Sequence, residues 1–193
     1  MNLGLARGKV RLAPYDTDWK REFAREAASL RSALGQIILQ VEHIGGTSIE
    51  GMMAKPIIDL MVVISSAISR TAMEEPLAKL GYEYRANGCT HDRIFFAKGV
   101  STCRTHYLSI TQLHLQFYKE KLAFRDYLRT HPQAAMDYCR LKQKLAALYQ
   151  NDRALYTEGK RAFVEQILSD ACDARPSVIF EIGGTGTLSY KGR

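Results

Sequence analysis

Several familiar signatures are missing from this 193-residue sequence, and each absence narrows the classes of protein that fit it. The four cysteines are scattered without Cys-x-x-Cys spacing, which argues against a zinc site or a disulfide framework and fits a reducing compartment. No apolar run approaches the roughly 20 residues of a membrane span. The basic N-terminal residues are not followed by the apolar stretch of a signal peptide. We therefore expect a cytoplasmic protein that does not associate with membranes.

Three common catalytic signatures are also absent: the Gly-x-x-x-x-Gly-Lys-Ser/Thr loop, the His-Glu-x-x-His helix and the Gly-x-Ser-x-Gly elbow. Positive charge is present instead, with a formal net charge of +7 at pH 7, and a basic protein favours an anionic partner. The charge is spread along the chain, and no arginine-rich run is interleaved with aromatic residues. A dedicated nucleic-acid interface is therefore not predicted, and simple solubility is the alternative explanation of the charge.

The composition describes one globular domain with a helical appendage. A hydrophobic content of 46% is ample for the core of a chain of this length. Residues 1–112 mix strand and helix patterns, and we predict an α/β (α+β) fold with a mixed sheet of roughly four to six strands and helices packed on one face. From residue 113 the periodicity is helical, so residues 113–172 are predicted to form a helical segment of the same compact unit. The polar tail, residues 173–193, is predicted to be disordered or docked on a partner, with one strand pattern at 177–182.

Sequence patterns predict helices and strands on both sides of the central stretch. Apolar residues recur at helical spacing from Trp19 to Leu34, just before a glycine, and the tryptophan is predicted to be core. A capping box that begins at Thr71 predicts the start of a second helix. The last of three C-terminal helices is predicted from Leu155 to Leu168. Outside the central stretch, strands are predicted at 10–15, 82–85, 93–98 and 104–110.

One stretch in the middle of the chain combines a strand, a glycine turn and a helix start. Residues 37–44 are β-branched and apolar enough for a strand. Gly45 and Gly46 let the backbone turn tightly, with no Cβ in the way of a ligand. Thr47 and Ser48 can cap a short helix, whose free N–H groups would face outward and attract an anion.

A lone carboxylate interrupts the strand that follows. Residues 57–64 form a near-continuous apolar run, typical of a strand covered on both faces, and Asp59 stands within it. A carboxylate there is costly unless it is paired, metal-bound or at an open end of the sheet. The structural interpretation is a sheet core with a capped turn and one edge-exposed aspartate. The functional interpretation places a phosphate cradle beside a metal ligand, because Mg²⁺ binds through one or two carboxylates together with phosphates.

The same stretch resembles the GrpB family, which is assigned to the nucleotidyltransferase (polymerase-β-like) fold. The family motif Glu-His-Ile-Gly-Ser-Thr-Ser-x-x-Gly-x-x-Ala-Lys-Pro-Ile-Ile-Asp is similar to residues 42–59, with Gly46 in place of the first serine. The resemblance covers residues 10–168, most of the chain. It implies that Asp59 is a catalytic residue and a ligand of Mg²⁺. The superfamily pattern expects a second acid two residues later, and that position is Met61.

Further matches to the family lie outside this motif. The family segment Arg-x-Phe-Phe-x-Lys-Gly is similar to the one that begins at Arg93, and its Arg-Thr-His-His-x-His strand to the one that begins at Arg104. Only His106 of the three histidines is kept. The family pair Tyr-x-x-x-Lys corresponds to Tyr156 and Lys160, on one helix face. Either the pair closes over a triphosphate, with the ring stacking and the ammonium pairing, or it is a solvated lysine beside a half-buried tyrosine.

Two hypotheses of function follow. In the first, the resemblance implies an enzyme that uses Mg²⁺ to transfer a nucleotidyl group from a nucleoside triphosphate, with charge compensation supplying most of the catalysis. In the second, the protein is a non-catalytic module that binds a nucleotide or phosphorylated small molecule, or supports a partner protein. The catalytic and metal-binding candidate is Asp59. The candidate phosphate-binding residues are Gly45, Gly46, Thr47, Ser48, Lys55, Arg93, Arg104, His106, Tyr156 and Lys160.

Overall fold

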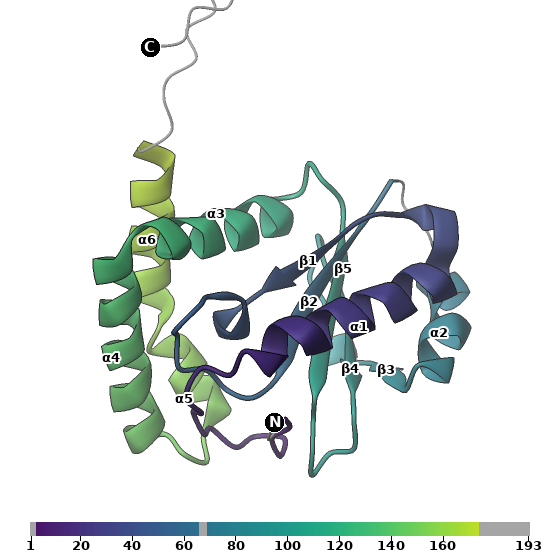
Figure 1. Ribbon diagram of the computed structural model, residues 1–193. Coiled ribbons are helices and arrows are strands. Elements are labelled where there is room, and N and C mark those ends of the chain that lie inside the picture. The colour runs from purple at the N-terminus through teal and green to yellow at the C-terminus, as the bar shows by residue number, and fades with distance from the viewer. Residues whose placement is uncertain (1–2, 66–68, 174–193) are drawn as a thin grey trace, which may run out of the picture.

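A five-stranded sheet forms the centre of the computed structural model, which describes residues 3–65 and 69–173 (Figure 1). The strands are β1 (Ile38–Ile44), β2 (Ile58–Ile64), β3 (Tyr82–Tyr84), β4 (Ile94–Lys98) and β5 (His106–Thr111). Their order in the sheet is β1-β2-β5-β4-β3. β2 and β5 run parallel, and the other three neighbouring pairs are antiparallel. The predicted mixed α/β fold is confirmed.

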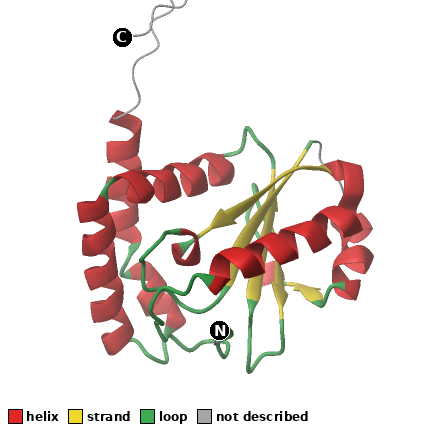
Figure 2. Cartoon of the chain, in the orientation of Figure 1, coloured by secondary structure: helices red, strands yellow, loops and turns green. Residues whose placement is uncertain are grey.

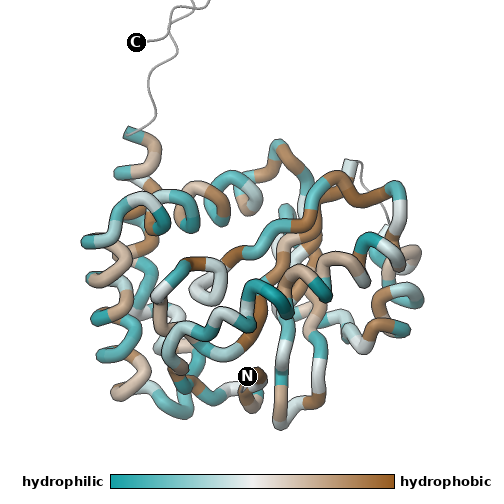
Figure 3. Tube along the Cα trace, in the orientation of Figure 1, coloured by the Kyte–Doolittle hydropathy of each residue, from teal (hydrophilic) through white to brown (hydrophobic). Residues whose placement is uncertain are grey.

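Alternation along β2 separates the two faces of the sheet. Every second residue from Ile58 to Ile64 belongs to the main apolar core, so Asp59 lies on the opposite face. Helices α1 (Asp18–Leu34) and α2 (Arg70–Lys79) cover the core face, and α1 crosses the strands (Figure 1). Figure 3 shows hydrophobic residues gathered along the central strands, which these helices cover. The Asp59 face is thus set apart from the main core.

The C-terminal helices reach the opposite face of the sheet. They are α3 (Gln116–Thr130), α4 (Pro132–Leu148), α5 (Arg153–Glu158) and α6 (Arg161–Asp173). α3 contacts β1, and its Phe117 packs with Ile44 and Met61 in a small apolar cluster. α3 also contacts α4 and α6, and Figure 2 shows these helices grouped at one side of the sheet. The helical segment therefore packs on the face that carries Asp59. The division at residue 112 stays a prediction.

The predicted final helix is two helices in the structure. The expectation of one helix over 155–168 is wrong, because α5 ends at Glu158 and α6 starts at Arg161. Gly159 lies at the break, and glycine is a poor helix former. A Cβ at Gly159 would lie 2.5 Å from Cδ2 of Leu145, so this position also requires the smallest residue. The break brings α5 close against α4.

Two local predictions near the first helices are also wrong. The strand expected at 10–15 is reduced to a single antiparallel bridge between Ala13 and Ala54. The capping box from Thr71 does not form, because α2 already begins at Arg70 and its N-cap, Ser69, makes no side-chain capping bond.

Two expectations concern the ends of the chain and membranes. The strand pattern at 177–182 and the rest of the predicted tail beyond residue 173 lie outside the described residues. Within the described ranges, no helix is both long enough and apolar enough to cross a bilayer.

The central strand offers a test of the core. Leu60 on β2 is fully buried, whereas Leu39 on β1 is 49% exposed. We expect Leu60→Ala to lower the free energy of unfolding by about 2–5 kcal/mol, because it removes apolar contacts and leaves a cavity. Leu39→Ala is the control and should change it by no more than about 0.5 kcal/mol. Urea denaturation followed by circular dichroism measures both, and similar losses would contradict this arrangement of the core.

Candidate functional site

The turn after β1 brings a glycine backbone against the carboxylate of β2. Ile44, the last residue of β1, pairs with Asp59 in the antiparallel register. Gly45 follows with a φ of 72°, which glycine adopts without strain. A Cβ at Gly45 would lie 2.5 Å from Oδ2 of Asp59. The structure therefore brings together the glycine turn and the aspartate that the sequence analysis singled out.

The hydroxyl groups of the turn make hydrogen bonds to other groups of the protein. Oγ1 of Thr47 lies 2.9 Å from Nε2 of His43 and donates to the carbonyl oxygen of Ile57 at 3.5 Å. The Ser48 hydroxyl donates to the carbonyl oxygen of Gly45 at 2.6 Å. Thr47 and Ser48 are both buried. Their side chains hold the shape of the turn, and what the turn offers a ligand is its main chain.

The main chain of the turn keeps free donors. Among the described residues, the N–H groups of Gly46 and Thr47 donate no main-chain hydrogen bond. No role was assigned to His43 from the sequence. Its contact with the Thr47 hydroxyl helps to hold this conformation of the turn. Burial is the main reason that the pKa of His43 falls to about 3, so the ring is neutral, and it stacks on Phe23 with 4.6 Å between ring centroids.

Four cationic side chains surround Asp59. The carboxylate interacts electrostatically with Lys55, Arg153, Lys160 and Lys121, in decreasing order of strength. Burial nevertheless raises the pKa of Asp59 above its ordinary value, and the four cations only oppose that rise. The residue is half-buried. We call these five residues the Asp59 cluster.

The lysines of the Asp59 cluster have also lost much of their hydration. Burial is the largest cause that lowers the pKa of Lys160 to about 7 and that of Lys55 to about 8. Neighbouring cations lower both values further, and burial lowers the pKa of Lys121 in the same way. Glu120 and Asp92 also attract Lys121, but Asp59 alone does not neutralise the other three cations. The surplus of positive charge favours an anion at this place.

An aromatic ring positions two of these lysines. The ammonium of Lys160 lies 4.5 Å from the ring centroid of Tyr156, and that of Lys55 lies 5.7 Å from it. Such contacts stabilise a cation over the face of the ring. Tyr156 is only 1% exposed, so its ring is not free to stack on a ligand. The tyrosine orients the lysines, which differs from both interpretations of the pair made from the sequence.

The same aromatic-lysine spacing recurs on two further helices. Lys121 of α3 lies 5.2 Å from the ring centroid of Phe117, four residues earlier. Lys142 of α4 lies 4.9 Å from the ring centroid of Tyr138, again four residues earlier. From the sequence, only Tyr156 and Lys160 were recognised as such a pair, and in the structure Lys160 lies in the link between α5 and α6. Applied to every helix, the spacing identifies all three lysines.

Lys142 packs against the glycine turn. Its ammonium donates to the carbonyl oxygen of Met53, and a Cβ at Gly46 would lie 3.3 Å from Nζ. Burial lowers the pKa of Lys142 to about 8, and Lys55 adds to that shift. The second glycine of the turn thus makes room for a further buried cation.

Arg153 is another residue that the sequence analysis missed. Its guanidinium lies 5.0 Å from the ring centroid of Tyr107, and Nη1 donates to the tyrosine hydroxyl at 3.4 Å. Tyr107 pairs with Asp59 between β5 and β2. The helical spacing of Arg153 from Tyr156 and Lys160, three and seven residues on, was the available signal.

The predicted arginines divide between two places. Arg93 interacts electrostatically with Asp59 and lies 4.9 Å from the ring centroid of Phe95, at the edge of the Asp59 cluster. Arg104 is held elsewhere, because Nη2 donates to Glu83 at 2.9 Å and Nη1 donates to the carbonyl oxygen of Gly99. Arg104 is only 5% exposed, so these partners occupy its side chain.

His106 does not lie with the predicted phosphate-binding residues. Tyr107 pairs with Asp59, so His106, one residue earlier, lies on the other face of the sheet. Its ring faces Glu22 of α1 there, with 3.5 Å between Nε2 and Oε1. The histidine belongs to the layer between α1 and the sheet.

The position of the expected second acid is apolar. Met61 is fully buried and packs with Ile44 and Phe117. On β5, the partners of Asp59 and Met61 are Tyr107 and Ser109, neither of which is acidic. Asp59 is thus the only carboxylate that these two strands offer. A single carboxylate among four cations does not fit Mg²⁺ on its own, because the cations repel a second positive ion.

A groove opens near the same turn but not at Asp59. It has a volume of about 720 Å³ and lies between residues 48–52 and helices α3 and α4. Its lining includes Ile49, Met52, Leu128 and Arg129, and no residue of the Asp59 cluster. Charge and main-chain donors therefore define the candidate site, and this groove is a separate feature.

Comparison with known proteins places the chain in a family. Residues 9–170 match the family described as GrpB protein. The chain belongs to the GrpB family. It is 33% identical over 172 residues to the glutamate-rich protein GrpB of Alkalihalophilus pseudofirmus, covering 87% of this chain and 99% of that one. The resemblance stated from the sequence is confirmed.

Solved structures extend the comparison. The crystal structure of conserved protein GrpB from Enterococcus faecalis is 34% identical, with a TM-score of 0.78 over 84% of this chain and 98% of that one. The Cid1 poly(U) polymerase with bound MgGTP is similar at 15% identity and a TM-score of 0.47, over 69% of this chain and 44% of that one. The second likeness is too distant to carry an argument about chemistry.

The contact between Gly45 and Asp59 can be measured against a matched glycine. Gly51 has almost the same φ, 73°, but no atom within 4 Å of a Cβ placed on it. We expect Gly45→Ala to lower the free energy of unfolding by about 2 kcal/mol more than Gly51→Ala, because only the first Cβ collides with a neighbour. Both variants share the backbone strain. Equal losses in urea denaturation would show that the carboxylate does not touch the turn.

The lowered lysine pKa values predict a pH dependence of stability. Lys160 titrates near pH 7 in the folded protein and near its ordinary 10.5 when unfolded. Between these values the unfolded chain binds more protons, so the free energy of unfolding should rise as pH increases from 7 to 9. Lys160→Met should reduce the slope, measured by urea denaturation at several pH values. The exposed Lys144→Met is the control, and an unchanged slope in Lys160→Met would count against the burial of this lysine.

Proposed function

We propose that the Asp59 cluster binds the phosphate chain of a nucleotide or of another phosphorylated small molecule. The observation that carries the proposal is the excess of half-buried cations, Lys55, Lys121, Arg153 and Lys160, around one carboxylate. Buried charges are stable when they are paired, and a multiply charged phosphate would pair them. The charged groups already lie over aromatic rings, so binding would immobilise little that is not already held.

The glycine turn supports the proposal from the other side. Gly45 and Gly46 bring main chain, with no side chain, to the edge of the Asp59 cluster. The free N–H groups of Gly46 and Thr47 are suitable donors to a phosphate oxygen. A phosphate chain seated there would meet the ammonium and guanidinium groups of the Asp59 cluster and amides from one turn. The base or acceptor group is not defined by this chemistry.

Mg²⁺-dependent nucleotidyl transfer is the second candidate function. The contact of Asp59 with a glycine turn favours it, because bound phosphates could supply the ligands that the protein lacks. The buried Met61 disfavours it, because no second acid holds a metal at that position. The geometry therefore supports a phosphate-binding module better than a metal-dependent transferase.

The direction in which Asp59→Asn changes the affinity for ATP distinguishes the two functions. If phosphate binds the cations directly, Asp59→Asn removes a repulsive charge and should tighten binding of ATP about tenfold, without Mg²⁺. If Mg²⁺ bridges Asp59 to the phosphates, the same variant should weaken Mg²⁺-dependent binding. Calorimetric titrations with ATP, CTP, GTP, UTP and tripolyphosphate, each with and without Mg²⁺, measure both.

Two controls complete the experiment. Glu75→Gln removes an 81% exposed carboxylate on α2, on the far side of the sheet, and should leave binding unchanged. Lys160→Met should weaken binding of every phosphate ligand. A wild-type protein that binds none of these ligands would overturn the proposal.

A further inference from the structure

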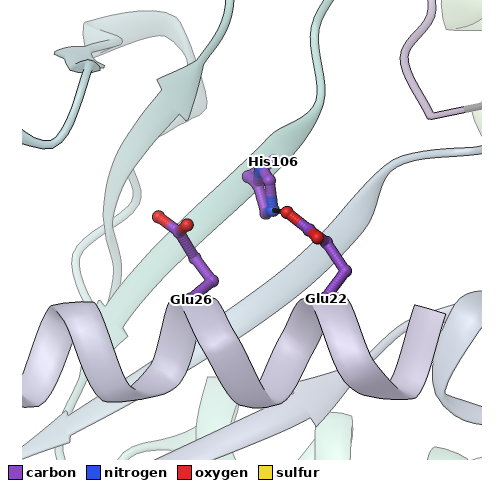
Figure 4. Close-up of side chains that lie close together, drawn as sticks. All are labelled: Glu22, Glu26 and His106. Atoms are coloured by element: carbon purple, nitrogen blue, oxygen red, sulfur yellow. Dashed lines mark ion pairs between the residues drawn. The ribbon is translucent and has the colours of Figure 1, made fainter. Parts of the chain in front are cut away.

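Three buried side chains meet on the face of the sheet opposite the Asp59 cluster. Glu22 and Glu26 lie one turn apart on α1, and His106 reaches them from β5 (Figure 4). One ligand atom from each lies within 4.8 Å of the others. The three residues are 8%, 4% and 3% exposed, so their polar atoms are removed from bulk water. We call them the α1–β5 triad.

The histidine of the triad has an unused nitrogen. Nε2 of His106 is buried and makes no hydrogen bond within the described part of the chain. Nδ1 lies 2.9 Å from Oγ1 of Thr105, and an N–H at Nδ1 would donate to that hydroxyl. That tautomer leaves a lone pair on Nε2, which faces Oε1 of Glu22 at 3.5 Å. Two acceptors facing each other repel unless a positive species lies between them.

The cations that accompany the triad approach from its outer side. Nζ of Lys98 donates to both carboxylate oxygens of Glu26 at 2.8 Å, and Arg25 pairs with Glu22. The side chains of Lys98 and Arg25 are 27% and 72% exposed, so each can turn toward water. Neither one hydrogen-bonds the imidazole. Within residues 3–65 and 69–173, no cation hydrogen-bonds Nε2 of His106 at the inner corner of the triad.

We propose that the α1–β5 triad binds a divalent transition-metal ion, with Zn²⁺ as the reference ion, through Glu22, Glu26 and His106. An imidazole nitrogen with two carboxylates is a donor set that suits Zn²⁺, Co²⁺ or Mn²⁺, whereas Mg²⁺ and Ca²⁺ take oxygen ligands. Tetrahedral bonds of about 2.0 Å place ligand atoms roughly 3.3 Å apart. Binding would therefore require side-chain rotations that close the present 4.8 Å spread of the triad, and Lys98 would have to leave Glu26.

The proposed ion would act on the fold and not on the phosphate site. α1 is packed on the core face, and His106 stands on β5 next to Tyr107, whose side chain faces the other way. The ion would join a helix near the N-terminus to a strand about 80 residues later, and such cross-links stabilise most when they close long loops. The expected consequence is a metal-dependent rise in stability.

The test uses protein without a polyhistidine tag, freed of metal by a chelator. Titration with Co²⁺ should give visible absorption bands and a stoichiometry of one, and Zn²⁺ should displace it. His106→Gln and Glu22→Gln should each weaken Co²⁺ and Zn²⁺ binding on the order of 100-fold. His114→Gln removes an exposed histidine and should bind as the wild type does. Circular dichroism of the chelator-treated variants confirms that they fold.

A further variant keeps all three ligands, so it tests the site even if the ligand variants fail to fold. Lys98→Gln removes the competing ammonium from Glu26, so it should bind Zn²⁺ about tenfold more tightly. Zn²⁺ should also raise the thermal unfolding midpoint of the wild type, and not that of His106→Gln. Equal Co²⁺ affinity in the wild type and His106→Gln, or no gain in Lys98→Gln, would overturn the proposal and leave the triad as a buried ion-pair network.

Discussion

The register between β1 and β2 is the constraint on which the candidate site depends. Because Ile44 pairs with Asp59, the first residue of the turn falls beside the carboxylate. Gly45 can take that place because it combines a positive φ with the absence of a Cβ. A shift of one residue would move Asp59 into the core and bring an apolar residue to the turn. The chemistry of the site is therefore tied to strand pairing before any ligand is considered.

Charge imbalance is the second constraint. Asp59 is opposed by more cations than it can neutralise, and Lys55, Lys142 and Lys160 all have pKa values that burial lowers to between about 7 and 8. A fold that only needed stability would gain from apolar residues at these positions. The presence of lysines there supports the proposed binding of an anion, whether or not a metal takes part.

Much of this arrangement could be predicted from the sequence, and the failures have physical causes. The mixed sheet and the glycine turn beside Asp59 could be predicted because apolar runs and turn residues determine local structure. The last predicted helix is split near Gly159, where Leu145 leaves no room for a Cβ, and local spacing does not reveal that packing. Arg104 and His106 were grouped with the phosphate site on family resemblance alone, although alternation along β5 places the histidine on the other face. Lys121 and Lys142 were missed because the aromatic-lysine spacing was considered on one helix only.

The three aromatic-lysine pairs have a mechanical consequence. Lys121, Lys142 and Lys160 come from α3, α4 and the link between α5 and α6, so like charges converge where separate helices meet. Coulomb repulsion at that junction works against the packing of the helices on the sheet. An anion seated between them would reverse the sign of that interaction and fasten segments far apart in the chain. Anion binding at this site and the stability of helix packing in the C-terminal half would then be coupled in one equilibrium.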